Sequence, residues 1–330
     1  MAPSYTQETR ASELVPLYAS NIKGKTILIT GVSPGGLGEG YVKQVAVAKP
    51  GTFILAGRSP AKFQSLVDEL NANHPEIKVK TLPLNLLSFT DVRTAAETVN
   101  SWDDVPNIDV LVNNAGIMAV TYKKSEDGFE SQFQTNHLSH FLFTNLIMRK
   151  ILASLAPRVV SVSSNVHRVG PIRWTDYNFG EGDRYNPWLS YGQSKTANAL
   201  FAIELAKRLG SKGLITFGMC PGTSLTNLSA HGRDDLAAFA AGLTEMDSIF
   251  GNKWSTGMAE LFFKDNDQGV ATHVFSSFDT SIVEHNGEFV SDCHLADPNE
   301  EEVYAWAASK VDAERLWRLS EKLVGQEFKY

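Results

Sequence analysis

The stretch KTILITGVSPGGLG, residues 25–38, joins a short apolar run to a glycine-rich turn. The run KTILIT (25–30) has the length and β-branched composition of a buried parallel strand. The turn ITGVSPGGLG (29–38) follows it and leads into a stretch with helical character. Glycines let a backbone approach a pyrophosphate closely, and a helix N-terminus attracts its negative charge. The stretch therefore predicts the first strand–turn–helix unit of a dinucleotide-binding fold.

Similar apolar runs recur along the chain: TFILAG (52–57), IKVKTLPL (77–84), IDVLVNN (108–114), RVVSVSS (158–164), LITFGMC (214–220) and GEFVSD (287–292). Between them lie helical stretches at 60–73, 125–155 and 187–209. Ser59 is the expected N-cap of the first of these, with Pro60 at its first helical position. This alternation predicts a single Rossmann-type α/β domain with one doubly wound parallel sheet.

Three segments interrupt the alternation. Residues 1–22 are polar, and we expect an arm that wraps or frays outside a domain spanning 23–330. Residues 165–190 form a long loop, and 224–266 form a longer insertion; both follow strand C-termini, where ligands bind in such sheets. The insertion could close over substrate as a lid. The alternative is a pair of helices packed for stability or for a subunit contact.

Composition excludes several classes of function. The chain has 30 Lys and Arg against 37 Asp and Glu, a net charge of -7 that argues against nucleic acid as the main partner. Cys220 and Cys293 cannot make a disulfide framework and lack metal-ligand spacing, so we expect a reducing compartment and no metal site. No signal peptide, membrane anchor or membrane-spanning run is apparent, which makes the cytoplasm the expected location.

The end of the second expected strand bears on cofactor choice. It is followed by Arg58 and Ser59, with no Asp or Glu to accept hydrogen bonds from a ribose 2′-hydroxyl. A guanidinium suits a 2′-phosphate through charge-assisted, bidentate pairing. We therefore expect NADP(H) rather than NAD(H), against the alternative that Arg58 is a solvated surface residue.

The sequence YGQSK places Tyr191 and Lys195 one helical turn apart on one face. A cation beside a phenol favours the phenolate and lowers its pKa, so the phenol can exchange a proton with a carbonyl or alcohol oxygen. A Tyr-x-x-x-Lys match is common by chance and needs support elsewhere in the chain.

That support comes from polar and small residues at the ends of other strands. Ser163 and Ser164 end one strand, the tetrapeptide 113–116 (NNAG) ends another, and PGT (221–223) follows a third. Asn136 lies in a helical stretch, where a polar amide is not favoured. All fall where the carboxyl ends of parallel strands would gather around a ligand.

These motifs follow one another along the chain in the order TG-VSPG-GLG, NNAG, Asn136, VSS, YGQSK and PGT. Together they resemble the pattern of the short-chain dehydrogenase/reductase family, and the resemblance covers nearly the whole chain. The branch it is most similar to is the retinol dehydrogenase and WW-domain oxidoreductase-like group. The segments that carry this similarity are QTNHLSHFLFT (134–144), GEFVSDCHLA (287–296) and LWRLSEKLVG (316–325).

The resemblance implies a role for each matching residue. Tyr191 would be the acid/base, and Lys195 would lower its pKa and hold the nicotinamide ribose. Ser164 would orient the substrate oxygen, and Asn136 would hold a water of the proton relay. The residues implied in cofactor binding are Gly31, Ser33, Gly36, Leu37, Gly38, Arg58, Asn85, Leu86, Asn113, Ala115, Gly116, Tyr191, Lys195, Pro221, Gly222 and Thr223.

The chain also departs from the family pattern. Its glycine loop has one extra residue, so Gly35 or Gly36 could fill the middle position. Asn85 stands before Leu86 where the family has Asp, and an amide can still accept and donate hydrogen bonds to adenine. The branch often carries an N-terminal membrane anchor, whereas this sequence shows none.

The expected function is NADP(H)-dependent hydride transfer to or from a carbonyl or alcohol carbon, with a fairly large apolar or aromatic ketone or aldehyde as substrate. The alternatives are a non-catalytic NADP(H)-binding sensor or scaffold, and a C=C reductase on the same fold. The resemblance also implies a possible homodimer through the two long central helices.

His167 is either a base or a loop residue, and the second interpretation is favoured. The loop aromatics either line a substrate pocket or anchor the loop: Trp174, Tyr177, Phe179, Tyr185 and Trp188.

Overall fold

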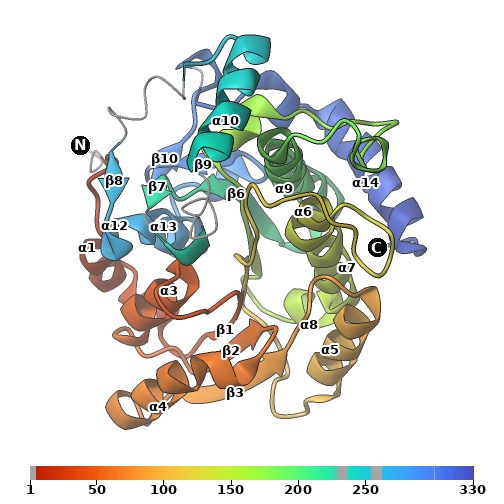
Figure 1. The fold of residues 1–330 in the computed structure, drawn as a ribbon. Coiled ribbons are helices and arrows are strands. Elements are labelled where there is room, and N and C mark those ends of the chain that lie inside the picture. Colours follow the sequence, from red (N-terminus) through yellow and green to blue (C-terminus); the bar gives the residue numbers. More distant parts are fainter. Residues whose placement is uncertain (1–4, 225, 229–235, 254–261, 301) are drawn as a thin grey trace.

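An eight-stranded sheet runs through the centre of the computed structural model, which describes residues 5–224, 226–228, 236–253, 262–300 and 302–330 (Figure 1). The strand order is β10-β9-β6-β5-β4-β1-β2-β3, and neighbours pair in parallel except β9 with β10. The strands are β1 Thr26–Thr30, β2 Thr52–Gly57, β3 Lys78–Pro83, β4 Val110–Asn113, β5 Arg158–Val162, β6 Ile215–Cys220, β9 Phe289–Ser291 and β10 His294–Leu295. Each predicted run contains one of these strands; β10 was not predicted.

Helices cover both faces of the sheet, which confirms the predicted doubly wound α/β fold. One face carries α1 Ala11–Leu17, α2 Ala19–Ile22, α3 Leu37–Ala46, α4 Gln64–Asn73, α12 Asn266–Gly269 and α13 Ala271–Phe278 (Figure 1). The other carries α5 Phe89–Ser101, α7 Ser139–Leu146, α8 Met148–Leu152, α9 Pro187–Leu209 and α14 Lys310–Val324. An apolar cluster fills each interface, because the strands are buried on both sides.

Residues 11–22 of the predicted N-terminal arm pack against the domain instead of fraying from it. Helices α1 and α2 span most of 11–22, and Leu14, Val15 and Ile22 are buried in the same cluster as α3 and α13. The Tyr18 hydroxyl donates a hydrogen bond of 2.6 Å to Asp279, which follows α13. The apolar spacing of three and four residues was the signal for this helix, masked by polar neighbours.

Two predicted helices differ from the structure at their N-terminal ends. The stretch 125–155 becomes helical only at α6 (Ser131–Phe133), continues through a π-helical turn at Gln134–Leu138, and breaks between α7 and α8. The stretch 60–73 begins as a 3₁₀ turn at Pro60–Phe63. Ser59 occupies the N-cap position there, but its side chain accepts no helix N–H.

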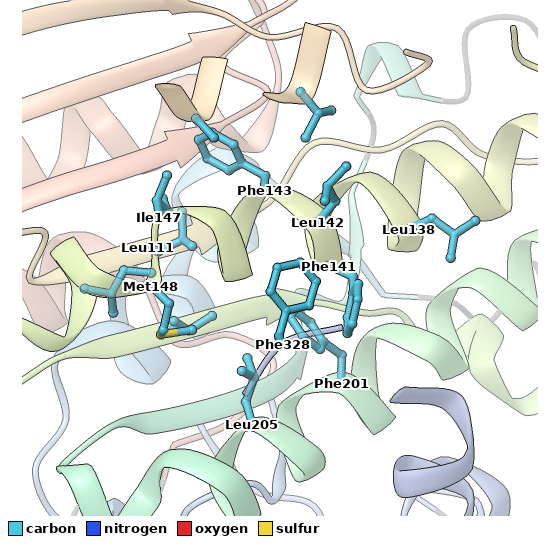
Figure 2. Packing of buried hydrophobic residues seen from close by; sticks show 14 of the residues in the cluster. Leu111, Leu138, Phe141, Leu142, Phe143, Ile147, Met148, Phe201, Leu205 and Phe328 are labelled. Atoms are coloured by element: carbon cyan, nitrogen blue, oxygen red, sulfur yellow. The ribbon is translucent and has the colours of Figure 1, made fainter. Parts of the chain in front are cut away.

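The chain's own C-terminus covers the outer faces of α7 and α9. Trp317 of α14 is buried, with its ring centroid 4.9 Å from Phe141 and 6.1 Å from Phe201. Figure 2 shows Phe141, Phe201 and Phe328 gathered between these helices. The helices from which a subunit contact was expected therefore pack against α14 on this side.

The switch point of the sheet lies between β1 and β4. From β1 the strand order runs through β2 to β3 at one edge, and from β4 it runs through β5 and β6 toward the other. The carboxyl ends of β1 and β4 nearly touch, since a Cβ on Gly31 would lie 2.7 Å from the Ala115 Cα. Open α/β sheets bind their ligands at this point.

The predicted insertion at 224–266 follows β6 at the same edge. Its described part contains the helix α10 (Leu236–Phe250) and the strand β8 (Phe263–Lys264), which pairs with β7 (Thr223–Ser224). Residues 225, 229–235 and 254–261 of the insertion lie outside the described residues. Helix α10 stands beside α9 at the top of Figure 1.

Candidate active site

The glycine turn after β1 forms a cradle at the N-terminus of α3. Gly31 and Gly35 have positive φ angles of 77° and 71°, which L side chains rarely adopt. A Cβ on Gly38 would lie 2.3 Å from the Gly31 carbonyl oxygen, so the helix and the turn pack without side chains between them. Gly36 directly precedes α3, and no side chain caps that helix. The cradle and the uncapped N–H groups of the first helical turn fit a dinucleotide pyrophosphate.

This geometry bears on the extra residue in the loop. Gly36 occupies the N-cap with an extended backbone (φ -90°, ψ 165°), and Gly35 makes the left-handed turn before it. Gly36 therefore stands at the N-terminus of α3, and Gly35 makes the turn that leads into it.

A buried chain of hydrogen bonds ties β1 to the helix that holds Asn136. The Thr30 hydroxyl oxygen accepts from the N–H groups of Asn114 (3.0 Å) and Ala115 (2.9 Å), so its own hydrogen is left for His140 Nε2 at 2.9 Å. His140 then carries its proton on Nδ1 and donates to the Asn136 carbonyl oxygen at 3.1 Å. Burial lowers the pKa of His140 to about 4, which keeps it neutral. Sequence reasoning missed Thr30 and His140.

Asn136 lies in the π-helical turn and is fully buried. Its Oδ1 accepts from the Ile117 N–H at 2.9 Å, and its Nδ2 donates to the Ile117 carbonyl oxygen (2.9 Å) and to Ser194 Oγ (2.8 Å). The Asn136 amide thus joins the segment after β4 to helix α9 at Ser194, the residue before Lys195. Such π turns often occur at functional sites.

Tyr191, Lys195 and Ser164 come together at the carboxyl ends of β5 and β6. The Lys195 Nζ lies 5.5 Å from the centroid of the Tyr191 ring and donates a 2.8 Å hydrogen bond to the Val162 carbonyl oxygen. It also approaches Gly116, where a Cβ would stand 3.6 Å from Nζ. The Ser164 side chain lies near enough to the Tyr191 phenol to act on its pKa, which it lowers.

Burial is the main influence on the pKa values of Tyr191 and Lys195 in this structure. Burial raises the pKa of Tyr191, and the Ser164 side chain only partly opposes the rise. Burial lowers the pKa of Lys195 to about 8. The ammonium donates to a carbonyl oxygen, and desolvation is the largest influence on the pKa of Tyr191. Tyr191 is consequently a protonated acid at neutral pH.

The two serines after β5 have different environments. Ser163 Oγ donates to the Lys195 carbonyl oxygen at 2.7 Å and supports helix α9. Ser164 caps the 3₁₀ turn Asn165–Val169, and its carbonyl oxygen accepts from His167 Nδ1 at 2.7 Å. His167 Nε2 accepts from the Tyr304 N–H at 3.1 Å, so both ring nitrogens are used. His167 is therefore a loop residue that positions Ser164.

Asn113, Asn85 and Leu86, which were also predicted to bind the cofactor, lie at or after the ends of β4 and β3. Asn113 points away from the edge and donates to Thr144 Oγ1 of α7 at 2.9 Å, with its Oδ1 left unpartnered. Asn85 donates to Asp91 at 2.9 Å and accepts from the Leu87 N–H at 3.3 Å, so it organises its own turn. The Leu86 carbonyl oxygen accepts a bond from Ser139 of α7.

The last predicted cofactor residues lie after β1, β2 and β6. Arg58 follows β2 and is exposed, and among the described residues no hydrogen bond or ion pair engages it; Ser33, in the glycine turn, is also exposed. After β6, Pro221 leads to Gly222, which has a φ of 84° and a Cβ position 2.6 Å from Lys264 Cε. Thr223 begins β7.

An apolar cluster surrounds the Tyr191 ring. Leu243 and Met246 of α10 belong to it, together with Trp188 at the start of α9. The other buried members are Ala119, Val166 and Val169, and Met118, Leu189 and Phe250 pack against them. Of the loop aromatics only Trp188 is in this cluster; Trp174 and Tyr177 pack on the main core, and the Phe179 and Tyr185 rings lie 5.5 Å apart. Most of the aromatics therefore anchor the loop.

Membrane-spanning helices and metal sites are both absent from the residues that the structure describes. No helix among them is long and apolar enough to cross a membrane. No three His, Cys, Asp or Glu side chains within those residues gather as a metal site requires.

The short chain dehydrogenase family model matches residues 25–179. Retinol dehydrogenase 12 of Mus musculus is 32% identical over 92% of this chain and 87% of its own length. Retinol dehydrogenase 14 of Homo sapiens is 33% identical over 92% of this chain and 87% of its own length. The short-chain dehydrogenase/reductase prx1 of Penicillium roqueforti is 34% identical over 92% of this chain and 86% of its own.

Solved structures agree on the fold. A crystal structure of an uncharacterised Mycobacterium paratuberculosis protein, 30% identical, covers 94% of this chain and 98% of its own with a TM-score of 0.69. The NADPH-bound carbonyl reductase from chicken fatty liver, at 17% identity, covers 83% and 99% with a TM-score of 0.56. These matches confirm the similarity expected from the ordered motifs, and the chain belongs to the short-chain dehydrogenase/reductase family, near its retinol dehydrogenase branch.

Proposed function

We propose that the protein is an NADP(H)-dependent oxidoreductase that reduces a fairly large apolar or aromatic ketone or aldehyde. The observation that carries the proposal is the gathering of Tyr191, Lys195 and Ser164 at the carboxyl ends of β5 and β6, with the Tyr191 ring inside an apolar cluster. Family membership supports hydride transfer, and relatives named retinol dehydrogenases fit an alcohol–carbonyl interconversion.

The residues that would hold the cofactor follow the edge of the sheet. The glycine cradle before α3 would take the pyrophosphate, and Ala115 and Gly116 leave room for a close approach beside it. Lys195, whose Nζ faces Gly116, is placed to hold the nicotinamide ribose. Bound NADPH would supply the hydride.

The chain's own groups provide the proton and the alignment. The Tyr191 phenol donates a proton to the carbonyl oxygen as that oxygen gains charge, and the Ser164 hydroxyl hydrogen-bonds the same oxygen. Lys195 is a buried cation that stabilises the phenolate left behind. Asn136 holds the Ile117 backbone and Ser194 in place beside these groups.

The surroundings of Tyr191 favour an apolar substrate. Leu243, Met246 and Trp188 present hydrocarbon and aromatic surface next to the phenol. A polar substrate would lose its hydration there without gaining hydrogen bonds.

The location we propose is the cytoplasm, because Cys220 and Cys293 are both buried free thiols that suit a reducing compartment.

The proposal is tested by incubating the protein with NADPH and a panel of aliphatic, aromatic and polar aldehydes and ketones. We expect oxidation of NADPH, followed by its absorbance, with apolar and aromatic members and little with polar ones of similar size. A protein that binds NADPH, as detected by thermal shift, but oxidises it with no member of the panel would be a sensor or scaffold and not the proposed reductase.

Arg58 is expected to set the preference for NADP(H). Replacing Arg58 with alanine should raise the Kd for NADP⁺ by about 10- to 100-fold, because a charge-assisted bidentate bond to the 2′-phosphate is lost. The Kd for NAD⁺, which has no such phosphate, should change less than about threefold. Calorimetric titration of both nucleotides measures this.

Arg149→Ala is the matched control, since it removes an exposed arginine of α8 outside the predicted site. It should leave both affinities unchanged. Tighter binding of NAD⁺ than NADP⁺ by the unaltered protein would contradict the assignment of Arg58.

A further inference from the structure

Helix α10 rests on the first turn of α9, four residues before the proposed acid. Gly242 of α10 allows the approach, because a Cβ there would stand 3.1 Å from Trp188 Cδ1. One turn of α10 then places Leu243 and Met246 against the cluster that contains Tyr191, and both side chains are buried. The described part of α10 thus forms one wall of the apolar surroundings of Tyr191.

Asn186 connects the two helices through both ends of its amide. Its Oδ1 caps α9 by accepting from the N–H groups of Trp188 (2.9 Å) and Leu189 (3.1 Å). Its Nδ2 donates to the Gly242 carbonyl oxygen (3.2 Å) and to Glu245 Oε2 (2.7 Å) of α10. These partners fix the orientation of the Asn186 amide. If its oxygen and nitrogen were exchanged, the NH₂ group would face the N–H groups of α9, and the oxygen would face the oxygens of Gly242 and Glu245. Asn186 is buried.

We propose that Asn186 is a positioning residue that latches α10 onto the catalytic helix and so sets how tightly an apolar substrate is held beside Tyr191. We call the hydrogen bonds from Asn186 Nδ2 to Gly242 and Glu245 the latch. The latch is a property of the fold and can be tested without substrate, whereas its effect on substrate binding rests on the proposed function. A residue that served only as a helix cap would need its Oδ1 and not its Nδ2.

Asn186→Asp separates these two roles. Aspartate is as good an N-cap as asparagine and keeps an oxygen for both N–H groups of α9. It has no N–H to give to Gly242, and it brings a second carboxylate against Glu245. The variant therefore keeps the cap of α9 and removes the bond to α10.

Glu245→Gln supplies the matched control and the rescue. In the single variant the glutamine oxygen still accepts from Asn186, so the latch remains. In the double variant Asn186→Asp with Glu245→Gln, the glutamine N–H donates to the aspartate, and donor and acceptor are exchanged. The pair can thus be broken and remade with changes of one atom at each side chain.

Amide hydrogen exchange of the full chain tests the latch. We expect peptides covering 240–250 to exchange about tenfold faster or more in Asn186→Asp, at wild-type rates in Glu245→Gln, and within about threefold of wild type in the double variant. Exchange in the rest of α9 should be unchanged. Wild-type exchange of 240–250 in Asn186→Asp, or acceleration spread over the whole chain, would overturn the proposal.

Kinetics then tests the consequence for substrate. With an apolar carbonyl substrate, Asn186→Asp should raise KM about tenfold and change kcat less than about threefold, because Tyr191, Ser164 and Lys195 are untouched. A fall in kcat with unchanged KM would contradict the role in substrate binding. If the wild-type protein shows no turnover, the proposed function fails while the exchange result still decides the latch.

Discussion

Tyr191→Phe is expected to lower kcat/KM for carbonyl reduction by about 10²- to 10⁴-fold while leaving the binding of NADPH within about threefold of wild type. The substitution removes only the phenol oxygen from a buried ring. It deletes the proposed acid beside Ser164, and the uncharged ring stays in the apolar cluster with Trp188 and Val166. Steady-state NADPH oxidation gives the first quantity, and titration of NADPH by fluorescence gives the second.

Tyr177→Phe is the control for loss of a phenol oxygen elsewhere in the chain. Tyr177 packs on the main core, with its ring 6.2 Å from Phe133 and 6.3 Å from Phe129. Its activity should match that of the wild-type protein. Activity within about threefold of wild type in Tyr191→Phe would show that another group supplies the proton.

The free energy of unfolding is expected to fall by about 4 kcal/mol between about pH 6.5 and about pH 5.5. Burial lowers the pKa of His137 and His273 to about 3, and that of His140 and His167 to about 4. In the unfolded chain each imidazole takes up a proton below about pH 6.5, whereas in the folded protein it stays neutral until its own lower pKa. The unfolded state therefore binds more protons in this range, and stability is lost as pH falls.

The magnitude follows from about 1 kcal/mol for each of these histidines over that one pH unit, with the full loss reached only below their folded pKa values. Urea unfolding at about pH 7.5, about 6.5 and about 5.5 measures it. His137→Leu should reduce the slope by about a quarter, whatever it does to stability at neutral pH. A flat profile from pH 7.5 to 5.5 would mean that the buried imidazoles are charged in the folded protein.

The sheet could be predicted because each central strand is a short apolar run bounded by turn residues. The run TFILAG became β2 with the same bounds, and the helix at 187–209 became α9 with the same bounds. Strand β10 was missed because it has only two residues and follows a turn in which Asp292 and Cys293 adopt positive φ angles of 45° and 61°. Neither residue is a glycine, so the usual turn signal was absent.

The sequence named residues of the candidate site, but it did not indicate how buried they are or which hydrogen bonds they make. The order of motifs named Ser164, Tyr191 and Lys195, and the fold brings them to one sheet edge. The direction of the Tyr191 pKa depends on burial by α10, which is far away in sequence. The bond between Thr30 and His140 joins residues 110 positions apart, and no local pattern specifies such a pair.

The transfer of deuterium from NADPH that carries deuterium at both C4 positions tests the central claim most directly. The wild-type protein is incubated with the labelled cofactor and an apolar α,β-unsaturated ketone, and the product is analysed by mass spectrometry. The account predicts deuterium on the carbinol carbon of an allylic alcohol, with the C=C bond intact. Deuterium on the former alkene carbon of a saturated ketone, or no transfer to any member of a carbonyl panel, would contradict it.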